Sequence, residues 1–70
     1  MSDQVDKLLD GMVRDGAISD YERRNTRQML VTRDGRRTAL SMRILIQLVA
    51  QDDTEARNWV SAETARLRST

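Results

Sequence analysis

The sequence contains no cysteine, no histidine and no proline, and its only aromatic residues are Tyr21 and Trp59. The lack of cysteine excludes a disulfide framework and any thiolate metal site. The lack of histidine removes the usual ligand of zinc and haem and the usual group for acid–base catalysis. We therefore predict that the chain is not an enzyme and that it holds neither a metal nor a cofactor.

Long apolar runs are also missing, because no run exceeds the three residues found at Ile44–Ile46. A run this short can neither span a membrane nor form the apolar segment of a signal peptide. We expect no membrane partner and a cytoplasmic location.

A length of 70 residues leaves room for a single domain, residues 1–70. The conformational entropy lost on ordering so short a chain nearly cancels the gain from its small core. Domains of this size depend on additional stabilisation, and disulfides and thiolate zinc sites are excluded here. The length therefore favours a homo-oligomer.

The net charge of +1 conceals a strong segregation of charge along the chain. Residues 1–22 carry six carboxylates and two cations, a net charge of −4. Residues 23–43 carry seven arginines against Asp34 alone, a net charge of +6, and residues 44–70 carry −1. Eleven of the twelve basic residues are arginine, whose forked guanidinium suits carboxylate and phosphate partners better than an ammonium does. The middle of the chain is therefore the candidate binding region.

Hydrophobic periodicity predicts an all-α fold, a small four-helix domain with helices at about 3–15, 20–31, 39–51 and 54–67. In the first helix, Val5, Leu8, Leu9 and Met12 fall on one apolar stripe. Gly16 is expected to end this helix in a left-handed conformation.

The second and last helices have capping signals at their starts. Ser19 and Glu22 have the S-x-x-E spacing of a capping box, which predicts a helix from Asp20 that forms a hairpin with the first. Asp52 and Glu55 have the related D-x-x-E spacing before the last helix.

The connection between the second and third helices can be interpreted in two ways. Asp34-Gly35 is a strong two-residue turn signal, so a β-hairpin pairing Leu30–Thr32 with Arg36–Thr38 is one alternative. The flanking segments are short and alternate poorly, and we therefore favour a helix–loop–helix connection, with Thr38 as the cap of the third helix.

The third predicted helix, residues 39–51, is apolar over most of its circumference, which is typical of a central helix. Three short neighbours cannot readily cover such a surface. We predict that Leu45, Ile46 and Val49 take part in self-association.

The segment Gly16–Glu22, G-A-I-S-D-Y-E, is similar to the second half of an EF-hand calcium loop. The acidic positions before it would be Gly11, Val13 and Asp15, so two of the expected carboxylates are missing. A capped helix start explains the same residues without calcium, and no metal site is predicted.

The same region follows a second pattern, G-x-I-S-x-x-E followed by a basic residue and an apolar pair. The residues that carry it are Gly16, Ile18, Ser19, Glu22, Arg27, Leu30 and Val31. Over residues 5–31 this pattern resembles SHOCT, a short helical hairpin of bacterial proteins, although Arg23 stands where that family has an aromatic residue. The resemblance implies a helical hairpin and a role in oligomerisation or interaction.

The candidate partner-binding residues are six arginines that share the second helix and the following loop: Arg23, Arg24, Arg27, Arg33, Arg36 and Arg37. Such a set can neutralise phosphates or dock on an acidic protein surface. The third helix is too apolar for a major groove, and aromatic residues for base stacking are few. An acidic protein surface is therefore favoured over nucleic acid as the partner.

These observations predict a non-enzymatic small protein that docks on or inhibits a larger macromolecule through its arginines, as bacterial and phage accessory proteins do. The alternatives are a nucleic-acid-binding regulator that uses the same arginines and a pure oligomerisation module.

Overall fold

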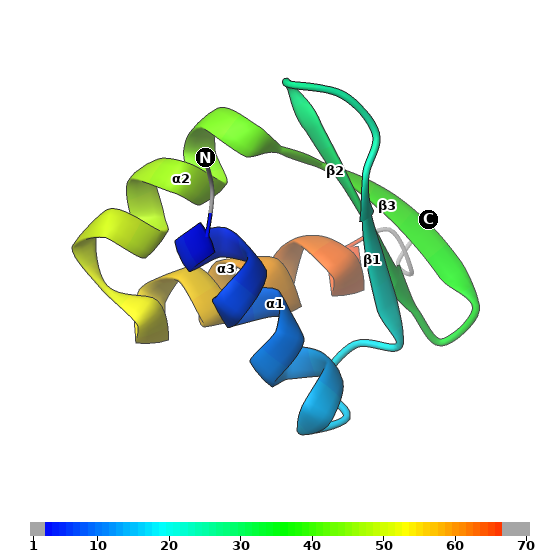
Figure 1. The fold of residues 1–70 in the computed structure, drawn as a ribbon. Helices are drawn as coiled ribbons and strands as arrows, with labels where there is room; N and C mark the ends of the chain where they lie inside the picture. The colour runs from blue at the N-terminus through cyan, green and yellow to red at the C-terminus, as the bar shows by residue number, and fades with distance from the viewer. Residues whose placement is uncertain (1–2, 67–70) are drawn as a thin grey trace.

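The structure is a computed structural model that describes residues 3–66. Its elements, in chain order, are α1 (Asp3–Arg14), β1 (Asp20–Arg23), β2 (Gln28–Arg33), β3 (Arg36–Ser41), α2 (Met42–Gln51) and α3 (Asp53–Arg66). The strands form an antiparallel sheet in the order β1-β2-β3, and the helices cover one of its faces (Figure 1). The prediction of an all-α, four-helix domain was wrong: this is an α+β fold.

The hairpin of β2 and β3 takes the place of the predicted helix–loop–helix. Its turn residues Asp34 and Gly35 have φ angles of 54° and 78°. Positive φ at both central positions defines the type I′ turn, whose twist matches that of paired strands and for which Asp-Gly is favoured. Arg33 therefore pairs with Arg36, and the pairing continues to Gln28 with Ser41.

The predicted second helix, residues 20–31, is replaced by β1, a loop and the first part of β2. Ser19 does not cap a helix; its N–H donates to the Thr32 carbonyl at 2.8 Å and begins the pairing of β1 with β2. Met29 and Val31 are buried, whereas Leu30 between them is only partly so. This alternation has the period of a strand, and a helix would have turned Met29 and Val31 to different sides.

The predicted third helix begins three residues late, at Met42. Thr38 and Leu40 are buried inward-facing residues of β3, so Thr38 is not the cap. That role belongs to Ser41, whose Oγ accepts a hydrogen bond from the Ile44 N–H at 3.3 Å. Strand β3 consequently passes into α2 without an intervening loop.

Helix α1 confirms the predicted apolar stripe, because Val5, Leu8, Leu9 and Met12 are all buried. Gly16 follows it with φ 81°, the left-handed conformation expected of a C-terminal cap. The Ala17 N–H donates to the Met12 carbonyl at 2.8 Å and the Gly16 N–H to the Val13 carbonyl at 3.1 Å. These two bonds form a Schellman motif.

Asp52 joins the last two helices. Its N–H donates to the Leu48 carbonyl at 2.8 Å, which ends α2, and its side chain accepts from the Thr54 N–H at 2.9 Å, which begins α3. The predicted start of the last helix is therefore confirmed. Ala56 and Val60 are buried on the inner side of α3. Leu67, the last residue of the predicted helix, lies outside the described residues.

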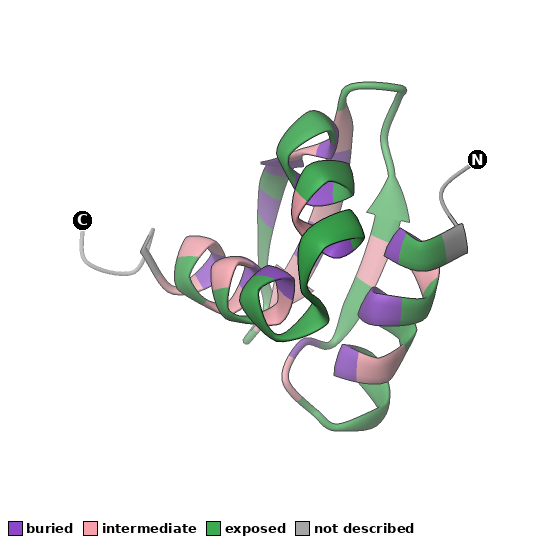
Figure 2. Cartoon of the chain, turned by 90° about the vertical axis from the view of Figure 1, so that its left-hand side faces the viewer, coloured by how far each residue is buried: buried purple, intermediate pink, exposed green. Residues whose placement is uncertain are grey.

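The core lies between the helices and the inner face of the sheet (Figure 2). Residues from α1, β2, β3, α2 and α3 meet there, among them Leu9, Met29, Leu40, Leu45 and Val60. The outer face of the sheet carries Glu22 and Ala39, both exposed, and Leu30, which is partly exposed. One layer of helices on one face of the sheet therefore supplies the core.

Tyr21 fastens β1 to α1. Its hydroxyl donates to Asp10 Oδ1 at 2.5 Å and lies 3.4 Å from the Asp6 carbonyl oxygen. Burial, the hydrogen bond to Asp10 and the charges of nearby carboxylates raise the pKa of Tyr21 from 10.0 to about 12. The contact thus favours the protonated phenol in the folded chain.

This pKa predicts how stability responds to alkaline pH. Above pH 10 the unfolded chain loses the Tyr21 proton before the folded chain does, so stability falls as the pH rises from 10 to about 12. Tyr21→Phe should be less stable at neutral pH by about 1 kcal/mol, the usual net value of a hydrogen bond. Its stability should show a smaller fall over the same pH range. Urea unfolding followed by Trp59 fluorescence measures the stability of the unmodified chain and of Tyr21→Phe. Parallel profiles of stability against pH would contradict the raised pKa of Tyr21.

Candidate functional site

Four arginines meet at the end of the sheet where β1 turns into β2. Arg23 ends β1, Arg24 and Arg27 belong to the connecting loop, and Arg43 lies in the first turn of α2. All four side chains are exposed. We call this group of Arg23, Arg24, Arg27 and Arg43 the basic tip.

The loop of the basic tip has a defined conformation because Asn25 organises it. The Asn25 Oδ1 accepts hydrogen bonds from the N–H groups of Arg27 at 2.8 Å and Gln28 at 3.0 Å. The Arg24 N–H donates to the Gln28 carbonyl at 3.0 Å and closes the loop. An asparagine that satisfies its neighbours' backbone in this way stabilises a turn.

A backbone hydrogen bond places α2 beside this loop. The Met42 N–H donates to the Arg27 carbonyl at 2.8 Å. Because β3 runs directly into α2, Arg43 follows at once and reaches the same end of the molecule as Arg27. Helix propensity alone would have placed Arg43 in the middle of a longer helix, which is why the sequence did not indicate its part in the site.

A hollow of about 700 Å³ lies between the loop and α2. We call it the tip hollow; it is lined by Thr26, Arg27, Ser41, Met42, Arg43, Ile46 and Gln47. Ile46 is 48% exposed. Among the residues that the structure describes, no acidic side chain lines the hollow or lies in the first turn of α2. The hollow therefore combines positive charge, neutral hydrogen-bonding groups and an apolar side chain.

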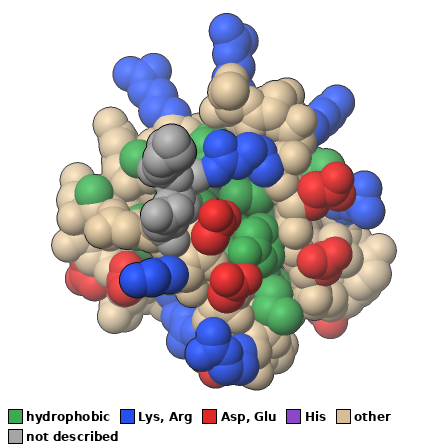
Figure 3. Space-filling view, in the orientation of Figure 1, with side chains coloured by type: hydrophobic (Ala, Val, Ile, Leu, Met, Phe, Trp, Pro, Cys, Tyr) green, Lys and Arg blue, Asp and Glu red, His purple; other side chains and the backbone are tan. Residues whose placement is uncertain are grey.

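The charge distribution of the surface agrees with this description. In Figure 3, Lys and Arg side chains extend from the upper end of the molecule, where Figure 1 places the β1–β2 loop. Asp and Glu side chains gather lower on the same face. The upper end of this face is therefore basic, whereas lower down Lys and Arg side chains lie among the Asp and Glu side chains.

The six arginines predicted as one binding face are divided between the two ends of the sheet. Arg23, Arg24 and Arg27 belong to the basic tip, whereas Arg36 and Arg37 lie beside the turn between β2 and β3. The length of β2 separates the two groups, about 17 Å for six residues. This separation was not predicted, because the capping signal and the periodicity indicated one helix over residues 20–31.

Arg33 has a structural contact instead. It is partly buried, and its Nη1 donates to the Ser61 carbonyl at 3.0 Å and to Thr64 Oγ1 at 3.2 Å. Thr64 is itself buried and donates to the Val60 carbonyl at 2.9 Å. Arg33 therefore connects the end of β2 to α3 and is not available as a free anion-binding group.

The three residues predicted for self-association are also separated. Leu45 and Val49 are 0% and 7% exposed and belong to the core, where α1 and α3 pack against α2. Ile46 alone of the three is exposed, together with Ile44 at 41%. The two isoleucines differ by 200° around α2 and flank its buried side, so they do not form one patch.

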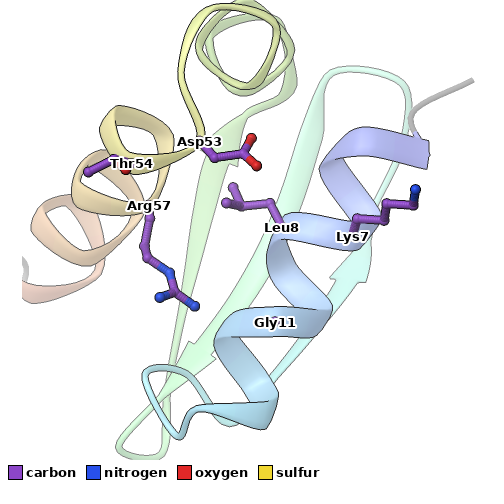
Figure 4. A pocket seen from close by; sticks show the side chains of 6 residues that line it. All are labelled: Lys7, Leu8, Gly11, Asp53, Thr54 and Arg57. Atoms are coloured by element: carbon purple, nitrogen blue, oxygen red, sulfur yellow. The ribbon is translucent and has the colours of Figure 1, made fainter.

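A second hollow, of about 300 Å³, lies between α1 and the start of α3 (Figure 4). Leu8, Gly11 and Arg57 line it together with Lys7, Asp53 and Thr54. The acidic Asp53 lines this hollow beside the basic Lys7 and Arg57, and Arg57 also forms an ion pair with Asp15 at 2.5 Å. It lacks the uniform charge of the tip hollow.

Within residues 3–66, no group of three or more acidic side chains comes together in a way that could hold a metal ion. No helix in that range is long and apolar enough to cross a membrane.

No protein-family model, no curated protein and no solved structure matches this chain. The similarity of residues 5–31 to SHOCT therefore stays a resemblance, and the second helix that it implies is replaced by strands.

Proposed function

We propose that this chain is a non-enzymatic binding protein that docks on the anionic surface of a larger macromolecule through its basic tip. The proposed place of action is the cytoplasm. The observation that carries the proposal is the position of Arg27 and Arg43 in the lining of the tip hollow, on two elements fixed to each other by the Met42–Arg27 hydrogen bond.

The energetics of the basic tip support a binding role. Like charges brought together repel, and this cost lowers stability unless an anionic group compensates it. Core packing does not require these side chains, because all of them are exposed. A partner with carboxylates or phosphates would provide this compensation for Arg24, Arg27 and Arg43 and gain forked, charge-assisted hydrogen bonds.

The structure offers a matched pair of variants to test this proposal. Arg24→Glu/Arg27→Glu changes the basic tip, and Arg36→Glu/Arg37→Glu changes the opposite end of the sheet. Each pair lowers the net charge from +1 to −3. We expect the first pair to weaken binding more than tenfold and the second pair to leave it nearly unchanged, because a direct contact outweighs a distant charge.

The measurement is the affinity for immobilised poly-L-glutamate and for a short DNA duplex, together with the set of proteins that each variant retains from a cell extract. Circular dichroism must show that both variants are folded. Equal weakening by the two pairs would reduce the effect to net charge and contradict a site at the basic tip.

Nucleic acid is the second candidate partner, and one observation favours it. The basic tip lies on the loop of an antiparallel β-ribbon, an element that other proteins insert into DNA grooves. A steep fall in DNA affinity with salt concentration, steeper than for poly-L-glutamate, would favour this alternative.

Self-association also stays a prediction. Of the residues first assigned to it, only Ile46 is accessible, so an interface through α2 would have to use Ile46 or Ile44.

A further inference from the structure

We infer that the tip hollow accepts a protein segment in which a bulky aliphatic side chain stands next to a carboxylate. This inference rests on the proposed function and specifies the partner of the basic tip. It is an acidic peptide segment with an apolar anchor, rather than a purely charged polymer.

Ile46 supplies an exposed apolar side chain to the tip hollow. The buried side of α2 is formed by Met42, Leu45 and Val49, so Ile46 is not needed for the core. It is 48% exposed and lies inside a hollow rather than on a convex surface. An aliphatic side chain in a concave site offers apolar area that a complementary side chain can remove from water.

Arg27 and Arg43 line the same hollow as Ile46. Arg43 precedes Ile46 by three residues on the same helix, so the two share one side of α2, about 4.5 Å apart along its axis. Arg27 lines the hollow from the loop. Arg43 and Ile46 are therefore separated by about one helical turn, and the described lining of the hollow contains no acidic residue.

A nucleic acid and an acidic peptide segment differ in how well they match Arg27, Arg43 and Ile46. A nucleic-acid backbone would satisfy Arg27 and Arg43 but would leave Ile46 against charged phosphates. Base stacking has no platform here, because no aromatic residue lines the hollow. A segment with a leucine-like side chain within one helical turn of an aspartate or glutamate satisfies all three residues.

The neutral residues of the hollow fit the same partner. Thr26, Ser41 and Gln47 offer hydrogen-bonding groups around the apolar side chain. The Ser41 hydroxyl already accepts from the Ile44 N–H and keeps its own proton to donate. Such groups can pair with the backbone of a bound segment, as polar groups do around the anchor of peptide-binding sites.

The test uses two synthetic peptides that differ at one position, Glu-Asp-Leu-Glu-Asp and Glu-Asp-Ser-Glu-Asp, both with blocked ends. A short DNA duplex is the third ligand. Each is titrated into the ¹⁵N-labelled chain, and amide shifts report both the affinity and the residues contacted. We expect the leucine peptide to bind about three- to tenfold more tightly than the serine peptide, with shifts at Thr26, Arg43 and Gln47.

Two isoleucine variants provide the matched control. Ile46→Thr should abolish the preference for leucine while retaining the weak binding of both peptides. Ile44→Thr makes the same change at a similarly exposed position outside the hollow and should leave the preference intact.

Several results would overturn the inference. These are equal affinity for the two peptides, absence of shifts in the hollow with the leucine peptide at about 5 mM, and tighter binding of the DNA duplex at the same residues. Failure of the proposed function is distinguishable, because then Arg24→Glu/Arg27→Glu would leave the binding of every anionic ligand unchanged. Loss of the leucine preference alone leaves the proposed function standing.

Discussion

Leu45→Glu is expected to leave the chain unfolded at neutral pH. The Leu45 side chain is 0% exposed and lies at the centre of the core, where a carboxylate would lose its hydration without gaining a partner. A domain of this size has a free energy of unfolding of about 4–10 kcal/mol, which the cost of a buried unpaired charge can exceed. Far-UV circular dichroism should show the loss of helix and sheet.

The neighbouring residue supplies the control. Ile46→Glu introduces the same side chain at a position that is 48% exposed, and this variant should remain folded. Leu45→Ala gives a graded test and should lower the free energy of unfolding by about 2–5 kcal/mol. A folded Leu45→Glu chain that differs from the unmodified chain only in oligomeric state would instead support the original prediction that Leu45 mediates self-association.

Arg33→Glu is expected to lower the free energy of unfolding by about 2–3 kcal/mol, because a hydrogen bond from a charged donor is worth about that much. The substitution also places a carboxylate against the acceptors that now receive Arg33, the Ser61 carbonyl and Thr64 Oγ1. Urea unfolding followed by Trp59 fluorescence measures the change.

Arg36→Glu and Arg37→Glu are the controls for this prediction. Both residues are exposed and lie within four positions of Arg33, and each substitution should change stability by less than about 0.5 kcal/mol. Arg33→Lys should recover part of the loss, since an ammonium keeps the charge but not the forked geometry. If Arg33→Glu were as harmless as the controls, its contact with α3 would contribute nothing.

The parts of the fold that could be predicted from sequence are those whose local signals agree with the tertiary structure. Helix α1 has an apolar stripe and a glycine at its end, and both appear as expected in the core and in the Schellman motif. Asp52 likewise caps α3 as its position indicates. In these segments, helical periodicity and burial select the same conformation.

Residues 20–41 show where local signals disagree. The spacing of Ser19 and Glu22 is typical of a helix start. Met29 and Val31, however, are both buried against the core, and two residues that differ by two positions face the same side only in a strand. The alternation of apolar and polar residues in β2 and β3 is interrupted, because the charged Arg33 and Arg36 occupy inward-facing positions at the end of the sheet. Asp34-Gly35 was the one clear strand signal, and its type I′ turn is present.

The candidate site was predicted in part, and partly for an incorrect reason. Arg23, Arg24 and Arg27 were grouped because a helix would place them on one side, and the loop between two strands brings them together instead. Arg43 and the tip hollow depend on the start of α2 at Ser41, which sequence periodicity placed three residues too early. The division of the arginines between two ends follows from the β2–β3 hairpin, the alternative that the Asp34-Gly35 turn signal offered.

The direct passage from β3 into α2 at Ser41 also links ligand binding to the stability of the whole chain. A ligand seated in the tip hollow contacts the first two turns of a helix whose other side carries Leu45 and Val49 of the core. The hollow therefore cannot form in the unfolded chain, and such a ligand binds the native state alone. At a concentration of 100 times its Kd it would add about 2.7 kcal/mol of stability. In a domain of 60–100 residues, this raises the melting temperature by on the order of 10 °C. Thermal-shift screening of acidic peptides is thus a direct route to the partner.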